Sequence, residues 1–329
     1  MTIGITLVGA GALGRGLAAL LVASGPVTLY SRAPTVAALK QDGHLRVHVP
    51  GPAGVLAVSV SEGSMLRVTS DPADIPPDDA VVFVTKGPDL AGVVQDVARS
   101  WARGAGWVAG LQNGVQKDTV LSQAFGADAV VGGATVLGAR RDSDGNWLVT
   151  GLGQSYFGEF GGPVSDRVAA IGRRFRDADL PCETDLDIAR LLWSKCANAI
   201  GAFGVGALTR LPSPVIMSRE VLVSAYLALV RETAAVAEAD GSPVGNFSDL
   251  PMADYLSTPA DEMAATIAGR LRAMGPLPPA YSSMAQDVMA GRPTEVHEVF
   301  GDVVARAARH GIPVPRTEFA YRIIAGLQG

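Results

Sequence analysis

Six residues near the start of the chain have the composition and spacing of a phosphate-binding turn. The pattern G-x-G-x-x-G is filled here by Gly9, Ala10, Gly11, Ala12, Leu13 and Gly14. The first glycine permits a tight turn, the second lets the backbone approach a pyrophosphate, and the third lets a helix pack closely on the preceding strand. The pattern predicts a dinucleotide site, and the alternative is a glycine turn that serves packing alone.

The two residues that follow the next predicted strand, residues 27–30, indicate which dinucleotide would bind. An Asp or Glu at this place would hydrogen-bond the 2′-hydroxyl of NAD and repel a 2′-phosphate. This chain has Ser31 and Arg32 instead. Because a guanidinium can hold a phosphate through two parallel hydrogen bonds, the pair predicts NADP as the cofactor. The alternative is that Arg32 is a solvated loop cation.

Lys195 is the residue whose chemistry fits proton transfer. Hydride addition to a carbonyl carbon leaves an alkoxide, which an acid must protonate or a cation must stabilise. Lys195 lies in the apolar helical segment 191–197. The pattern alone favours a lysine that extends its ammonium group to solvent, and the alternative is that a cleft holds Lys195 as the acid.

Lys86 and Asn113 each follow a predicted buried strand. Ligands of doubly wound sheets bind beyond the carboxyl ends of the strands, so we expect Lys86 to support the cofactor or its neighbouring loop. Asn113 precedes Gly114, and Asn-Gly is a turn dipeptide. Two interpretations of Asn113 therefore stay open: it serves the turn, or its amide lies beside a nicotinamide.

The elements that must position these residues form two parts. Apolar β-branched runs alternate with helical patterns as far as residue 182, and the later predicted strands at 129–137 and 147–157 extend the same sheet as a mixed one. Nearly all of the chain after residue 182 has helical periodicity. We therefore expect an α/β N-terminal dinucleotide-binding (Rossmann-type) domain, residues 1–182, and an all-α C-terminal domain, residues 183–329, with a substrate in the cleft between them.

Composition argues against several classes of partner. The chain has 329 residues, 48% hydrophobic content and a formal net charge of −5, so it can bury large cores and offers no basic footprint for nucleic acid or an anionic membrane. Cys182 and Cys196 lack metal-ligand spacing, and no metal site is expected. We expect neither a targeting segment nor a transmembrane span, and a cytoplasmic setting. Apolar helical stripes in the second half would serve a homodimer interface or a core.

The order and spacing of several short motifs resemble those of the ketopantoate reductase (2-dehydropantoate 2-reductase) family along nearly the whole chain. Beyond the glycine turn, the matching segments are Val84-Thr85-Lys86, Gln112-Asn113-Gly114, Leu192-Trp193-Ser194-Lys195, Ala207-Leu208-Thr209, Ser282-Ser283-Met284-Ala285-Gln286-Asp287 and Thr294-Glu295. The Ser-Ser-Met-x-Gln-Asp stretch followed by Thr-Glu is far more specific than the glycine turn.

This resemblance implies an NADPH-dependent reduction of 2-dehydropantoate (ketopantoate) to (R)-pantoate, a reaction of pantothenate biosynthesis. It implies that Lys195 polarises the ketone and supplies the proton, with Glu295 beside it to orient the substrate. Ser283 would hold the substrate carboxylate, while Lys86 and Asn113 would line the nicotinamide side. Arg32 would then hold the 2′-phosphate.

Three positions depart from the family pattern. Family members that act on ketopantoate commonly have asparagine where this chain has Ala199, Phe203 and Ala280. Loss of these amides weakens polar recognition and makes the pocket more hydrophobic. Ketopantoate remains the leading substrate, and another branched or aromatic 2-oxo acid is the alternative. A third hypothesis, a catalytically silent NADPH-binding regulatory protein, is disfavoured because Lys195 and Glu295 are both retained.

Overall fold

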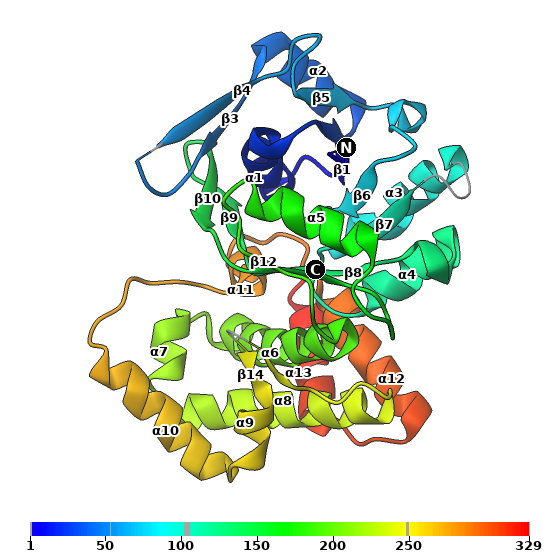
Figure 1. Ribbon diagram of the computed structural model, residues 1–329. Helices are drawn as coiled ribbons and strands as arrows, with labels where there is room; N and C mark the ends of the chain where they lie inside the picture. The colour runs from blue at the N-terminus through cyan, green and yellow to red at the C-terminus, as the bar shows by residue number, and fades with distance from the viewer. Residues whose placement is uncertain (1, 53, 102–105, 248–249, 329) are drawn as a thin grey trace. The chain divides into compact units, whose positions relative to one another are not determined.

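The computed structural model describes residues 2–52, 54–101, 106–247 and 250–328 (Figure 1). The chain forms two compact units. The first consists of Met1–Gln112 together with Lys117–Ile188, and the second of Asn113–Gln116 together with Ala189–Gly329. The short segment Asn113–Gln116 therefore belongs with the second unit, although only two residues separate it from the strand Trp107–Gly110 of the first.

A five-stranded parallel sheet forms the centre of the first unit, in the order β5-β2-β1-β6-β7. Its strands are β1 (Ile5–Val8), β2 (Val27–Tyr30), β5 (Leu66–Thr69), β6 (Ala80–Phe83) and β7 (Trp107–Gly110). Four of them, all but β5, are buried along their whole length, which explains their continuous apolar runs. The strand order changes direction at β1, with β2 and β5 on one side of it and β6 and β7 on the other. Ligands are therefore expected beyond the carboxyl ends of β1 and its neighbours.

Four helices follow strands of this sheet: α1 (Ala12–Leu21), α2 (Ala33–Asp42), α3 (Gly87–Ser100) and α4 (Gln116–Phe125). A fifth helix, α5 (Asp166–Arg176), comes later in the first unit and packs on the strands Ser155–Gly158 and Cys182–Glu183. The alternation of parallel strands and helices confirms the predicted Rossmann-type fold for the first part of the chain.

Among the described residues, the later strands join the central sheet only through an isolated parallel bridge between Val130 and Val108 of β7. Their ladders form separate sheets, so the prediction of one continuous mixed sheet was wrong in this respect. One further sheet joins β4 (Val55–Ser59), β3 (His44–His48), β10 (Trp147–Gly151) and β9 (Gly138–Arg141), and another joins β12 (Cys182–Glu183), β11 (Ser155–Gly158) and β8 (Gly132–Thr135). The β9–β10 hairpin packs on α1 instead. Gly16 of α1 allows this approach, because a Cβ at Gly16 would lie 2.9 Å from Val149 Cγ2.

The second unit is almost entirely helical, as predicted. Its helices are α6 (Ile188–Thr209), α7 (Ser213–Met217), α8 (Glu220–Ala239), α9 (Met252–Ser257), α10 (Ala260–Ala273), α11 (Ser283–Met289), α12 (Asp302–His310) and α13 (Pro315–Gly326). A π-helical turn, His297–Gly301, precedes α12, and two short strands, β13 (Asn246–Phe247) and β14 (Leu250–Pro251), form a small ribbon.

The long helix α6 forms the core of the second unit. Gly201 and Gly204 let α8 approach closely, since a Cβ at either position would lie 2.5 to 2.6 Å from Tyr226 or Leu229. By length and composition α6 could also cross a membrane, but 78% of its most apolar window is buried inside the fold. This burial is what a core helix requires.

Candidate active site

The glycine turn between β1 and α1 has the geometry of a phosphate cradle. Gly9 has φ of +122°, and its N–H donates to Tyr30 O at 2.9 Å. A Cβ at Gly14 would lie 1.8 Å from Gly9 O, whereas a Cβ at Gly11 would meet no atom within 4 Å. The fold itself therefore requires the first and third glycines, while Gly11 leaves open space of the kind that a phosphate would fill.

The first turn of α1 offers its backbone donors to that space. Gly11 is the N-cap residue and supplies no capping side chain, and the turn carries no acidic residue. Ala12 and Leu13 are partly exposed, as is Ala10 before them. Uncapped N–H groups at a helix N-terminus attract anions, so the turn fits a dinucleotide.

A positively charged residue, Arg32, follows β2 by two positions. Ser31 is partly buried, and its N–H donates to Thr69 O at 3.0 Å. Arg32 is exposed and is the N-cap residue of α2, whose first turn contains no acidic residue. A positive side chain without an acidic neighbour on that turn suits a phosphate better than a ribose hydroxyl.

Lys86 lies where β6 meets α3. It is exposed and is the N-cap residue of α3. One residue earlier, Thr85 O accepts a hydrogen bond of 3.1 Å from Gln112 Nε2. Gln112, which is 7% exposed, thus ties the end of β7 to the end of β6 and holds both loops in place.

Three of the predicted site residues meet within the second unit. Lys195 Nζ donates to Asn113 Oδ1 at 3.0 Å, and Asn113 Nδ2 donates to Glu295 Oε2 at 3.1 Å. All three side chains are partly exposed. The structure thus places Lys195 in a polar series with Asn113 and Glu295.

The two hydrogen bonds fix the orientation of the Asn113 amide. Its oxygen faces the ammonium group and its NH₂ faces the carboxylate, as the charges require. A flipped amide would oppose donor to donor and acceptor to acceptor. The Asn113 amide thus contacts both charged groups through hydrogen bonds of 3.0 and 3.1 Å.

The turn that follows Asn113 packs on the π-helical segment. Gly114 has φ of +80°, and a Cβ there would lie 3.1 Å from Glu298 O. Gly114 therefore takes the left-handed turn conformation that the Asn-Gly pair predicts.

Sequence reasoning missed Glu298, which lies beside this series. Its Oε2 atom is buried and has no hydrogen-bond partner among the described residues. Burial raises the pKa of Glu298, and the neighbouring charge of Glu295 raises it further. The π-helical turn could have drawn attention to this segment, because such turns are frequent at functional sites, but sequence periodicity does not reveal a single π turn.

One face of α6 carries Lys195, Ala199 and Phe203 at intervals of four residues. Ala199 and Phe203 are 6% and 8% exposed. Asn198 faces away from them, toward α8, and its Oδ1 accepts a hydrogen bond of 2.7 Å from the Tyr226 hydroxyl. The face that begins at Lys195 is therefore apolar beyond the ammonium group.

Ser283, the predicted ligand of a substrate carboxylate, is exposed at the first position of α11. The preceding Ser282 is the N-cap residue, and its hydroxyl accepts a hydrogen bond from Ala285 N at 3.3 Å. Ala280 is exposed in the loop before them, and its carbonyl accepts a hydrogen bond from Ser213 N.

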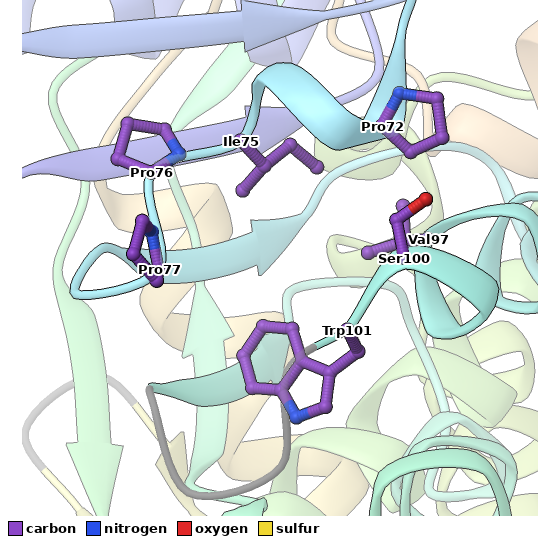
Figure 2. Close-up of a pocket in the computed structure, with 7 residues that line it drawn as sticks. All are labelled: Pro72, Ile75, Pro76, Pro77, Val97, Ser100 and Trp101. Carbon is purple, nitrogen blue, oxygen red and sulfur yellow. The ribbon is translucent and has the colours of Figure 1, made fainter.

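A small cavity in the first unit contains none of the charged side chains described above (Figure 2). It measures about 40 Å³ and is lined by Pro72, Ile75, Pro76, Pro77, Val97, Ser100 and Trp101. None of these side chains titrates near neutral pH, so the cavity offers no acid, base or charged ligand for catalysis.

Comparison with known proteins gives consistent matches over the whole chain. Residues 5–162 match the family model "Ketopantoate reductase PanE/ApbA", and residues 187–328 match "Ketopantoate reductase PanE/ApbA C terminal". A 2-dehydropantoate 2-reductase of Pyrococcus abyssi is 25% identical over 323 residues, which cover 98% of this chain and 97% of that protein.

Solved structures share the fold. The 2-dehydropantoate 2-reductase from Geobacter metallireducens GS-15 superposes with a TM-score of 0.79 at 28% identity, covering 98% of this chain and 99% of that one. A D-mandelate dehydrogenase in complex with NADH and anilino(oxo)acetate also gives 0.79, at 17% identity and with coverage of 99% and 98%. At that identity the second likeness concerns the fold alone.

Proposed function

Because this chain belongs to the ketopantoate reductase family, we propose that it is an NADPH-dependent 2-oxo acid reductase that converts 2-dehydropantoate to (R)-pantoate. The observation that carries this proposal is the series Lys195–Asn113–Glu295, joined by hydrogen bonds of 3.0 and 3.1 Å. It offers an ammonium donor that an amide and a carboxylate hold in one orientation, which is what reduction of a ketone requires.

Each member of the series has a separate role. When bound, NADPH supplies the hydride that reaches the carbonyl carbon. Lys195 hydrogen-bonds the carbonyl oxygen and delivers the proton that the resulting alkoxide takes up. Asn113 accepts an N–H of that ammonium group and thereby orients it, and Glu295 holds the amide and orients the substrate.

The remaining predicted residues bind and orient. We assign the cofactor phosphates to the glycine turn, the 2′-phosphate to Ser31 and Arg32, and the nicotinamide side to Lys86 and Asn113. Ser283 receives the substrate carboxylate, for which the exposed hydroxyl at the start of α11 is suited.

A second substrate class is supported by the apolar face of α6. Phe203 and Ala199 lie on the face of Lys195 and carry no donor or acceptor for a substrate hydroxyl. A branched or aromatic 2-oxo acid would match such a wall. The D-mandelate dehydrogenase that shares this fold was solved with anilino(oxo)acetate, so the fold accommodates an aromatic ligand.

The test is initial-rate oxidation of NADPH with ketopantoate, pyruvate, 2-oxoisovalerate and benzoylformate at matched concentrations. The highest kcat/KM for ketopantoate would support the pantoate reaction. Preference for 2-oxoisovalerate or benzoylformate would instead support a reductase of another 2-oxo acid. Binding of NADPH without oxidation by any of the four acids would contradict both and identify a regulatory binding protein.

A further inference from the structure

Two arginines meet on one tryptophan beside the glycine turn. The guanidinium carbon of Arg15 lies 4.6 Å from the ring centroid of Trp147, and that of Arg141 lies 5.1 Å from the same centroid. Arg15 Nε also donates to Ala10 O, within the turn itself, at 2.9 Å. The pair therefore adjoins the segment that we assign to the cofactor phosphates.

Strand register explains why these side chains converge. Trp147 and Arg141 are direct partners across the β9–β10 hairpin, so their side chains share one face. Val149, two residues after Trp147, lies on that same face and contacts α1 at Gly16. The face therefore turns toward α1, which Figure 1 draws beside β9 and β10, and it meets the first turn of the helix at Arg15.

The two guanidinium groups are like charges held close together. Burial lowers the pKa of Arg15, and the charge of Arg141 lowers it further, whereas Asp42 acts in the opposite direction. Their hydrogen bonds go to backbone carbonyls, Arg15 to Ala10 O and Arg141 to Gly145 O at 3.0 Å. Within the described part of the chain, neither forms an ion pair with a carboxylate.

The carboxylate closest in sequence is already engaged. Asp142, next to Arg141, accepts hydrogen bonds from the backbone N–H and the side-chain amide of Asn146 at 2.7 and 3.1 Å. Two cations side by side without such a partner are most stable when an anion lies between or beside them.

We propose that Arg15 and Arg141, held on Trp147, form a second phosphate-binding element that grips a phosphate group of the dinucleotide. This inference rests on the proposed function, because it takes the glycine turn as the cofactor site. The turn supplies neutral backbone donors, and the arginine pair supplies positive charge and terminal amino groups in a planar fork that matches phosphate oxygens. Trp147 restrains both side chains, so less side-chain freedom is lost when the phosphate binds.

The test is titration of the full-length chain with NADPH and with NADH, followed by the fluorescence of the bound nucleotide. Arg15→Gln and Arg141→Gln are compared with Arg140→Gln, which removes the same charge from an adjacent residue. Arg140 is exposed and pairs with Leu148, so it lies on the opposite face of β9. We expect Kd to rise about tenfold in each site variant, as for one lost charge-assisted contact, and to stay near the wild-type value in Arg140→Gln.

The two nucleotides identify which phosphate is held. A loss for NADPH alone would place the arginine pair at the 2′-phosphate, and equal losses for NADPH and NADH would place it at the pyrophosphate. Either result supports the proposal. Arg15→Lys retains the charge without the planar fork, and an intermediate Kd in that variant supports the same conclusion if Arg15→Gln does not fold.

Unchanged Kd values in both site variants, together with a lower Tm, would overturn the inference, because the stack would then serve only to fasten the hairpin to α1. Failure of the proposed function gives a different result. In that case the wild-type chain binds NADPH but oxidises it with none of the 2-oxo acids, and the titrations still decide the role of Arg15 and Arg141.

Discussion

Lys195 Nζ lies 3.0 Å from Asn113 Oδ1, although 82 residues separate the two in the chain. Asn113 leaves the end of a strand in the first unit, yet it belongs by its contacts to the helical unit that contains Lys195. The residue that accepts a hydrogen bond from the ammonium group therefore comes shortly after β7 in the chain. We assign that ammonium group to proton transfer.

Loss of the Lys195–Asn113 contact is expected to reduce turnover, and the effects of substituting the two residues should not add. Lys195→Ala should lower kcat by about 10²- to 10⁴-fold, as for loss of a general acid, and Asn113→Ala should lower it through misorientation of the ammonium group. In the double variant Asn113→Ala should add little, because its partner is already absent. Steady-state kinetics of the four proteins measure this cycle, and fully additive losses would show that Asn113 does not act through Lys195.

The glycine turn predicts opposite outcomes for two similar substitutions. Gly11→Ala should leave Tm nearly unchanged, because the added Cβ meets no atom within 4 Å, but it should weaken NADPH binding by filling the phosphate space. Gly14→Ala should lower Tm, since its Cβ would lie 1.8 Å from Gly9 O. Thermal unfolding and NADPH titration separate the two effects, and tight NADPH binding by Gly11→Ala would remove the phosphate from that space.

Arg32→Ala should discriminate between the two nicotinamide nucleotides. If the exposed guanidinium binds the 2′-phosphate, the substitution should weaken NADPH by roughly 1 to 3 kcal/mol, as for a lost charge-assisted hydrogen bond, and leave NADH nearly unaffected. Dissociation constants for both nucleotides check this. Equal losses would assign Arg32 a role other than recognition of the 2′-phosphate.

Glu298→Gln should stabilise the protein increasingly as pH rises. Burial and the nearby charge of Glu295 raise the pKa of Glu298 in the folded chain. A carboxyl with a raised folded pKa contributes stability below its unfolded pKa of about 4.3, and this contribution is lost as pH rises through the folded value. Gln does not ionise, so the Tm of the variant relative to the wild type should increase across that window.

The matched control for this prediction is Glu262→Gln, on an exposed position of α10. Its Tm difference from the wild type should show no comparable rise with pH. A Tm difference for Glu298→Gln that stays constant from pH 4 upward would show that Glu298 ionises in the folded chain as it does in the unfolded one.

Phe203→Asn should shift substrate preference toward ketopantoate. The amide would offer a hydrogen bond to the substrate hydroxyl from the face that carries Lys195, so kcat/KM for ketopantoate relative to 2-oxoisovalerate should rise by about tenfold. Phe319→Asn, at a position 64% exposed on α13, is the control and should leave the ratio unchanged. An unchanged ratio in Phe203→Asn as well would place residue 203 outside the substrate pocket.

The sequence by itself determined the type and order of the main elements and the family. The glycine turn, the apolar strands around it and the helical periodicity after residue 182 are local patterns, because strand burial, turn geometry and helix spacing act over a few residues. For the same reason the cation at Arg32 and the unusual Ala199 and Phe203 could be recognised without coordinates.

Only the tertiary structure decided which side chains meet. Glu295 reaches Asn113 across 182 residues, and the environment of Lys195 depended on that contact. The β9–β10 hairpin packs on α1, where Gly16 leaves room for Val149, and this packing is also what brings Arg141 to Arg15. Such contacts depend on how elements far apart in the chain pack together, which periodicity within any one element does not encode.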